Sequence, residues 1–207
     1  MRARAARIAV AALAVGLAVA ALALLGAALP GALPEDPPAA GYTVDAGSRV
    51  RLDGTSTLGR YTCAAGDVAG AGDVPRAGPA TAELTIGVAS FDCGQARMNR
   101  DFRRSLRAED APGIRFTLGL AEALAPEAHA GARVRVRAAG RLSLAGVERP
   151  VTVAAEGRRL GSGRVQLRGQ HALRMTDFGV RPPSGMLGLV RAHDGVVVVF
   201  DLTASRP

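Results

Sequence analysis

The stretch ARVRVRAAGRLSLAG, residues 132–146, alternates small aliphatic side chains with arginine or other polar side chains. Val134 and Val136 fall on one face of an extended chain, whereas Arg133 and Arg135 fall on the other. Because successive side chains of a strand point to opposite faces of a sheet, the stretch predicts a half-buried β-strand. Its inner face is aliphatic and its outer face is charged.

The same alternation recurs along most of the chain. Short glycine-containing turn sequences separate the alternating segments, and no succession of strand, helix and strand typical of a parallel sheet appears. We therefore predict an all-β protein with an antiparallel sheet, whose strand lengths suit either a closed barrel or a sandwich. The predicted strands are residues 48–57, 80–91, 113–124, 132–146, 149–160, 163–175 and 195–204, and a short opening strand, YTVD at 42–45, makes eight.

One segment departs from this alternation. In SFDCGQARMNRDFRRSL, residues 90–106, the apolar residues Met98, Phe102 and Leu106 recur every fourth position. This spacing is typical of an amphipathic helix and predicts one short helix over about 95–106. The helix either covers an open end of the sheet structure or crosses over its outside, and the pattern is compatible with both arrangements.

The N-terminal region is expected to direct the chain to a membrane. Residues 8–29 contain no charge and match the roughly 20 residues of a spanning helix, so we predict an apolar helix within residues 1–29 that anchors the chain. Small-residue sites keep a cleaved signal segment as the alternative. Arginines precede the apolar run and none follows it closely, which predicts export to the periplasmic or extracellular face of the cytoplasmic membrane. The proline-rich residues 30–41 predict a linker.

The chain has two cysteines, Cys63 and Cys93, and both lie in the part expected to be exported. An even number of cysteines in an oxidising compartment predicts a disulfide. Two buried free thiols are the alternative interpretation. A redox-active pair is disfavoured because the two residues form no C-x-x-C motif.

Several classes of function are disfavoured by the sequence. The net charge of +8 is carried by arginine without clustered aromatic residues, which argues against nucleic-acid binding and is better suited to anionic lipid headgroups. The histidines His129, His171 and His193 lack metal-ligand spacing, and no G-x-S-x-G motif is present. The glycine-rich residues 66–78 have no lysine and no following helix, so we expect a loop there rather than a phosphate site. We predict no catalytic residue, no metal ligand and no cofactor.

Four segments follow one another along the chain in the order in which a known family carries similar motifs: YTVDAGSRVRLDGTST, MNRDFRRSLRAEDAPGIRF, GRLSLAGVERPVTV and TDFGV. Together they resemble the YceI-like family of exported lipid-binding proteins, over about residues 42–204. The resemblance implies a lipocalin-like, eight-stranded antiparallel barrel that holds a long isoprenoid chain in its lumen, without catalysis. The paired cysteines and the expected membrane anchor depart from simpler members of the family.

Two functional hypotheses follow. The first is non-catalytic binding, sequestration or transport of a long apolar, isoprenoid-like lipid. The second is a membrane-tethered interaction or structural barrel with a filled core. Association into a homodimer is a further hypothesis about partners. For the first hypothesis, the one-sided alternation and the resemblance together predict that these residues line the lumen: Leu84, Ile86, Val88, Met98, Phe102, Phe116, Leu118, Val134, Val136, Leu142 and Leu144.

Overall fold

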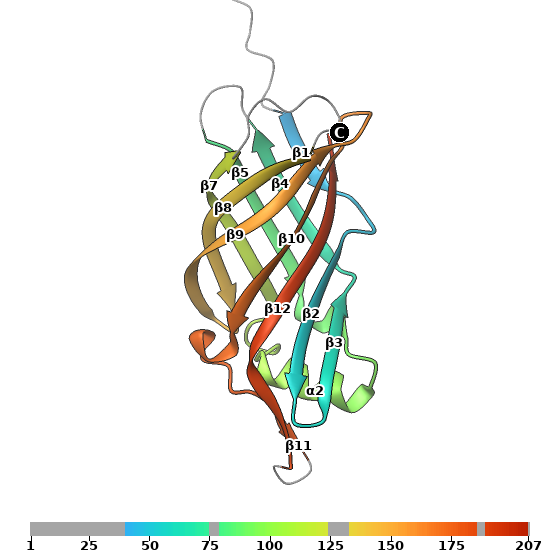
Figure 1. Cartoon of the computed structure of the whole chain (residues 1–207), viewed down its shortest axis with the longest axis vertical. Helices are drawn as coiled ribbons and strands as arrows, with labels where there is room; N and C mark the ends of the chain where they lie inside the picture. Colours follow the sequence, from blue (N-terminus) through green and yellow to red (C-terminus); the bar gives the residue numbers. More distant parts are fainter. Residues whose placement is uncertain (1–39, 75–78, 124–132, 186–188, 207) are drawn as a thin grey trace, which may run out of the picture. The chain divides into compact units, whose positions relative to one another are not determined.

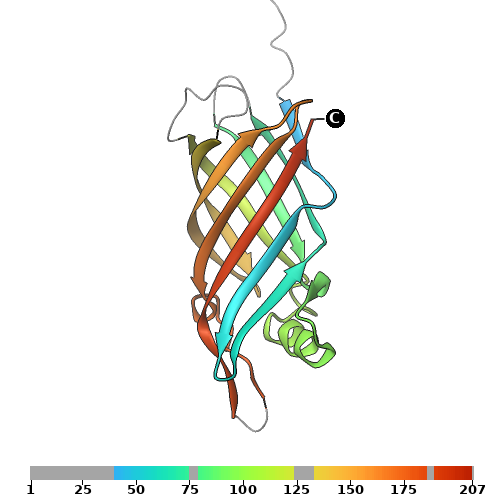
Figure 2. The same cartoon turned by 45° about the vertical axis from the view of Figure 1, so that its right-hand side comes forward.

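An eight-stranded antiparallel barrel forms the core of the protein in the computed structural model (Figures 1 and 2), which describes residues 40–74, 79–123, 133–185 and 189–206. Pairing of the first strand with the last closes the wall, with Thr43 opposite Ser205. In order around the wall, the strands are β1 (Ala40–Val44), β4 (Val68–Val74), β5 (Thr81–Gly87), β7 (Gly113–Ala123), β8 (Arg133–Leu144), β9 (Val147–Arg159), β10 (Val165–Arg174) and β12 (Val190–Ser205).

Short strands continue this wall at one end of the barrel. The strand β2 (Arg49–Ser56) follows β1 and pairs with β12, and β3 (Gly59–Ala65) pairs with β2 and precedes β4. The strand β6 (Phe91–Asp92) follows β5 and pairs with β3. Three wall positions are therefore each made of two consecutive strands, and β12 is long enough to pair with both β1 and β2.

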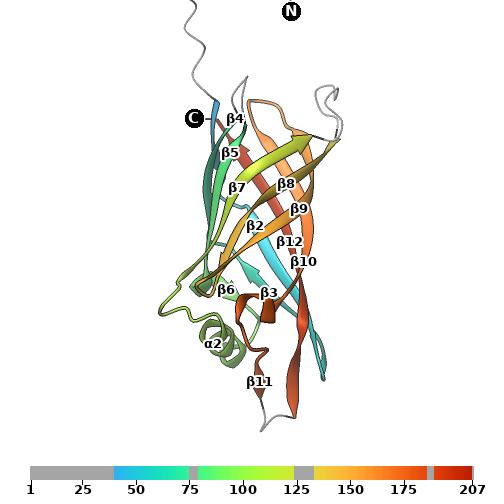
Figure 3. The same cartoon turned by 90° about the vertical axis from the view of Figure 1, so that its left-hand side faces the viewer.

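The helix α2 (Ala96–Ser105) lies at the same end of the barrel, as do β11 (Ser184–Gly185) and two single-turn 3-10 helices, η1 (Val88–Ser90) and η2 (Met175–Phe178) (Figure 3). The predicted helix is confirmed. None of the helices in the described ranges is long and apolar enough to cross a membrane. The predicted anchor, residues 1–29, and the linker up to residue 39 lie outside the described residues.

The antiparallel barrel predicted from the sequence is confirmed, but some assignments within it were wrong. The stretch 66–78 was expected to be a loop, whereas Val68–Val74 form β4. Its alternation is hidden because glycine occupies two inner positions, Gly70 and Gly72: a side chain at Gly70 would meet the backbone oxygen of Glu83 at 2.6 Å. In addition, the sequence predicted two separate wall strands at 42–45 and 48–57. In the structure, β1 and β2 follow each other along a single position of the wall, separated by a turn, and both pair with β12.

Two clusters of buried side chains fill the α2 end of the barrel, and Phe102 of α2 packs against both. One cluster packs against side chains of β7, β8 and β9, and the other contains side chains of β2, β3, β5 and β6. The first contains Val88, Leu106, Leu144, Ala145, Phe178 and Val180; the second contains Val50, Cys63, Ala65, Ile86 and Phe91. The apolar core of this barrel is therefore concentrated at one end.

Candidate functional site: the lumen of the barrel

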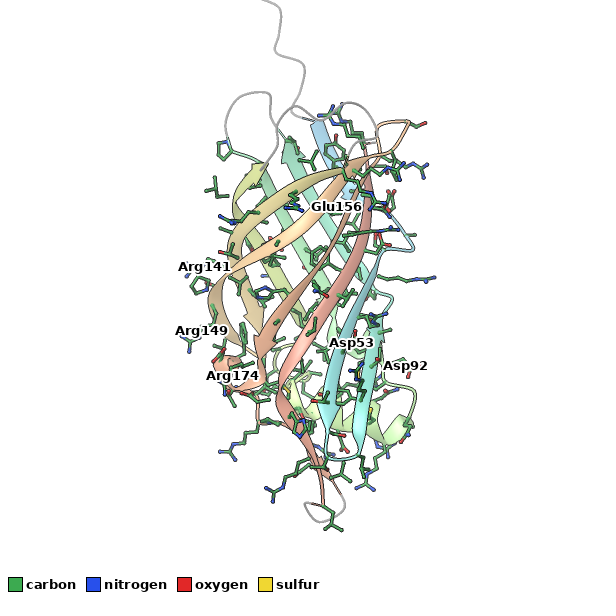
Figure 4. All side chains as sticks on the ribbon, in the orientation of Figure 1. Asp53, Asp92, Arg141, Arg149, Glu156 and Arg174 are labelled. Atoms are coloured by element: carbon green, nitrogen blue, oxygen red, sulfur yellow. A yellow bond between two sulfur atoms is a disulfide. The ribbon has the colours of Figure 1, made fainter. Side chains whose placement is uncertain are left out.

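The two faces of the barrel wall differ in chemistry. On β8, Val136 faces the lumen, whereas Arg133 and Arg141 point outward and form ion pairs with Glu156 and Glu148 of the neighbouring β9. The labelled side chain of Arg141 projects away from the barrel in Figure 4. Charge on the outer face and aliphatic groups on the inner face are what the alternation in the sequence predicted.

The lumen contains a cavity of about 910 Å³. Side chains from the barrel strands and from α2 line it, and most of these are aliphatic. Nine of the eleven predicted residues are in its wall: Leu84, Ile86, Met98, Phe102, Phe116, Leu118, Val136, Leu142 and Leu144. That these side chains contact a ligand remains a prediction.

Two predicted lining residues are not in the cavity wall. Val88 was wrongly assigned to a strand: the extended chain ends at Gly87, and Val88 begins η1. Its side chain is 1% exposed and packs in the first buried cluster beside Leu144. Val134 lies opposite Gly157, at the second position of β8, and does not line the cavity, which begins further along the strand.

Inward side chains away from α2 are only half-buried because they face open space rather than other atoms. Leu167 of β10 lines the cavity, and yet 36% of its surface is exposed. Leu118 of β7 and Ala155 of β9 also line the cavity and are half-buried. A closely packed core would bury such residues almost completely, so the interior of this barrel is hollow over much of its length.

Aromatic rings lie flat against the lumen wall where the neighbouring strand carries glycine. The ring of Phe200 on β12 covers Gly169 on β10, so that a side-chain carbon at Gly169 would lie 2.4 Å from the ring. Glycine inside a strand commonly marks such a close approach. The same arrangement joins Phe116 to Gly140 and Tyr61 to Gly54. Phe200 and Tyr61 were missed from the sequence, where only these glycines within alternating strands could have indicated them.

Substitution of Gly169 with alanine is expected to destabilise the barrel by about 1–3 kcal/mol, the usual cost of overpacking. The added carbon would meet both the Phe200 ring and, at 2.6 Å, the backbone oxygen of Ala154. Urea unfolding measures the change. Gly157→Ala is the matched control, because its added carbon would meet Leu167 and Val136 at 3.5 Å, an ordinary contact. Equal stability of the two variants would contradict this account of the wall.

The helix α2 is held at its end of the lumen by covalent and hydrogen bonds. Cys93, just before the helix, forms a disulfide with Cys63 of β3, which confirms the predicted pairing. The side-chain amide of Asn99 donates to Asp92 Oδ1 at 3.0 Å, and Asn99 Oδ1 accepts from the Cys93 backbone at 2.7 Å. The rings of Phe91 and Phe102 are 5.0 Å apart. Because Met98 and Phe102 line the cavity, α2 forms part of the lumen wall and does not merely cross its outside.

Hydrogen bonds near the start of α2 also stabilise the charged form of the Asp92 carboxyl. The bond from the Asn99 amide, and then that from the Gly94 backbone, lower the pKa of the Asp92 carboxyl from its usual value. The charged form of Asp92 therefore favours the observed position of the helix start.

A few polar side chains interrupt the apolar lumen. His171 of β10 and Tyr61 of β3 both face it. Partial burial lowers the pKa of His171 and raises the pKa of Tyr61, because each loses water around its charged form. Near α2 the wall also contains Arg97 and Asp101, which form an ion pair at 3.9 Å.

No group of three histidine, cysteine, aspartate or glutamate side chains in the described ranges is placed to hold a metal ion. The described lumen therefore offers apolar contact over most of its wall and few hydrogen-bonding groups. This arrangement suits the retention of an apolar molecule.

Comparison with known proteins agrees with this geometry. The family model described as YceI-like domain matches residues 42–204. No curated protein matches the chain significantly.

Several solved structures share the fold. BcnA from Burkholderia cenocepacia is 23% identical, with a TM-score of 0.63, over 78% of this chain and 99% of BcnA. A polyisoprenoid binding domain from Saccharophagus degradans, described as implicated in plant cell wall breakdown, is 19% identical with a TM-score of 0.65, over 82% of this chain and 99% of that domain. The Campylobacter jejuni YceI protein is 17% identical with a TM-score of 0.50, over 61% and 72% of the two chains.

Proposed function

Since the chain belongs to the YceI-like domain family, with a matched region over residues 42–204, we propose that it binds a lipid in the lumen of its barrel. The cavity of about 910 Å³ is the observation that carries this proposal. Ligand pockets in proteins are commonly about 300–1,000 Å³ and mostly apolar. A barrel with a filled core, the second hypothesis from the sequence, does not account for a cavity of this size.

We further propose that the ligand is a long isoprenoid-like chain and that the protein binds, sequesters or carries it without catalysis. The many aliphatic side chains of the wall suit a chain that offers little but apolar surface. The Saccharophagus degradans domain, which has the same fold, is described as polyisoprenoid binding. By the usual 25 cal/mol per Å², burial of about 400 Å² of ligand would contribute about 10 kcal/mol before the cost of immobilising the chain.

The proposed location is outside the cytoplasmic membrane, with residues 8–29 as the anchor. The uncharged run of these residues, the arginines before it and the proline-rich segment after it support this proposal. An anchored carrier would hold its lumen close to the membrane from which it takes a lipid.

One experiment tests binding and anchoring together. Full-length protein is expected in the membrane pellet after a carbonate wash, and mass spectrometry of a solvent extract of the purified protein should show one lipid class enriched over the bulk membrane lipid. Protein in the wash that begins after residue 29 would refute the anchor alone. Pellet protein that carries no enriched lipid would refute the binding proposal.

A further inference from the structure

The two most exposed of the large apolar side chains in the described ranges lie at the α2 end of the molecule. Leu58 is 76% exposed and Leu189 is 75% exposed. Leu58 lies in the two-residue turn between β2 and β3, and Leu189 lies just before β12 in the hairpin that pairs β11 with β12. Figures 1 and 2 show both hairpins extending beyond the barrel at this end, which we call the tip. Neither leucine belongs to a buried cluster of the barrel.

Hydrogen bonds hold the two hairpins of the tip side by side. The backbone N–H of Thr57 donates to the backbone oxygen of Arg191 at 3.0 Å, and the Thr57 hydroxyl donates to the backbone oxygen of Leu189 at 3.1 Å. The backbone N–H of Arg191 donates in turn to Thr57 Oγ1 at 3.2 Å. Because Thr57 directly precedes Leu58, these bonds place the two leucines on adjoining stretches of backbone. The tip is therefore an apolar contact surface that is formed before any partner binds.

The tip is basic as well as apolar. Residues 55–61 and 181–191 include Arg60, Arg181 and Arg191, and neither stretch contains an aspartate or a glutamate. Arg60 and Arg181 are exposed, and no ion pair joins either of them to another described residue. Arg60 and Arg191 each follow an exposed leucine by two positions. Each of the two leucines therefore has a positive charge close to it along the chain.

The helix α2 adds further positive charge at the same end of the barrel (Figure 3). All four arginines of the helix are exposed: Arg97, Arg100, Arg103 and Arg104. Asp101 is its one acidic residue, so the helix carries a net charge of +3, which Glu109 and Asp110 after the helix offset only in part. Arginine side chains near a bilayer surface are attracted to anionic headgroups.

We infer that the tip docks on the surface of a bilayer that contains anionic lipid. The two leucines enter the boundary between headgroups and acyl chains, and the arginines contact lipid phosphates. A second copy of the chain is a poor partner for this surface, because its tip would bring the same positive charges together. The inference goes beyond the proposed function and does not depend on what the lumen binds.

The position of the tip in the fold indicates which membrane it would meet. The strand β1, which follows the N-terminal region, begins at the end of the barrel opposite the tip (Figure 1). A tip on that side suits contact with a second membrane rather than with the one that holds the proposed anchor.

The test reconstitutes full-length protein into neutral phosphatidylcholine vesicles and measures the capture of a second, fluorescent set of vesicles. Vesicles that contain phosphatidylglycerol should be captured and neutral vesicles should not, and about 0.5 M salt should weaken capture because it screens the arginines. Leu58→Ser with Leu189→Ser is expected to reduce capture by about tenfold or more, because the burial of two leucines in lipid is lost. Arg60→Gln with Arg181→Gln should reduce capture by roughly fivefold for each arginine at low salt. If the recovered protein lacks residues 1–29, flotation of the protein with the same phosphatidylglycerol vesicles replaces capture.

The matched control is Val74→Ser with Leu120→Ser, which removes two exposed aliphatic side chains, 57% and 46% exposed, toward the other end of the barrel. This variant should capture phosphatidylglycerol vesicles as the wild type does. All variants should match the wild type in unfolding midpoint and in the binding of diphenylhexatriene, a fluorescent probe of apolar cavities, so that a loss of capture reports on the tip alone. Wild-type capture by the leucine variant would overturn the inference, as would equal capture of neutral vesicles or no capture at all by the wild type. Dimers that sediment together only with an intact tip, without capture of vesicles, would overturn it in favour of a second copy.

Discussion

Replacing Val136 with aspartate is expected to reduce the affinity for an apolar lipid by more than about 100-fold, which is a loss of roughly 3 kcal/mol or more. Val136 lines the cavity in the aliphatic part of β8, and Ala155 opposite it on β9 is too small and apolar to compensate a charge. A carboxylate there would keep its water, and the removal of that water by a bound chain costs several kcal/mol. Displacement of diphenylhexatriene and the lipid content of the purified protein measure the effect.

The control lies one residue away on the opposite face. Arg135 is exposed and lies across from Glu156, which already pairs with Arg133. Arg135→Asp should leave lipid binding nearly unchanged, although the two acids would lower stability by about 0.2–1 kcal/mol. Val136→Thr, with nearly the shape of valine, should fold normally and show an intermediate affinity. Equal lipid content in all three variants would refute a role for the lumen.

Loss of the Cys63–Cys93 disulfide is expected to lower the free energy of unfolding by about 3–4 kcal/mol on the chain-entropy model, because the bond closes a loop between residues 30 positions apart. The double variant Cys63→Ala, Cys93→Ala avoids free thiols, and urea unfolding measures the difference. Amide exchange should rise first in α2, since the bond joins the segment before the helix to β3.

Wild-type protein with and without reductant provides the comparison for this variant. Reduction should reproduce most of the loss, and the double variant should then not respond to reductant. The hydrogen bonds between Asn99, Asp92 and Cys93 do not involve the sulfur atoms and should keep α2 folded in the variant at low denaturant. An unchanged unfolding midpoint on reduction would contradict the predicted contribution.

The sheet could be predicted from the sequence wherever large aliphatic side chains alternate with charged ones. The residues around Val136 and Leu142 are of this kind, and both reach the cavity. The prediction from alternation failed where the residues on the inner face of a strand are small. In β4, Gly70 and Gly72 face neighbouring strands too closely for a side chain, so the segment has the composition of a loop and the geometry of a strand.

Other features of the lumen depend on contacts between distant strands, which alternation does not reveal. Val88 follows the pattern of Leu84 and Ile86, but the chain turns into η1 at that residue and buries the side chain in the core. The sequence argued only against a metal site at His171, because nothing in its own strand indicates that β9 separates from β10 beside it. The closure of the barrel by β1 and β12, and the position of His171 on the inner face, could be established only from the structure.

The long strand β12 also determines when the protein can fold. It pairs with β1, β2 and β10, and the Ser48 hydroxyl donates to the backbone oxygen of Thr203, 155 positions away. Closing so long a loop costs chain entropy before native contacts compensate for it, which makes topologies of this kind slow to form. Until residues as far as Ser205 have left the ribosome, the earlier hairpins have no partner to close the wall around their apolar face. Closure of a barrel with this topology therefore has to wait until synthesis of the chain is almost complete.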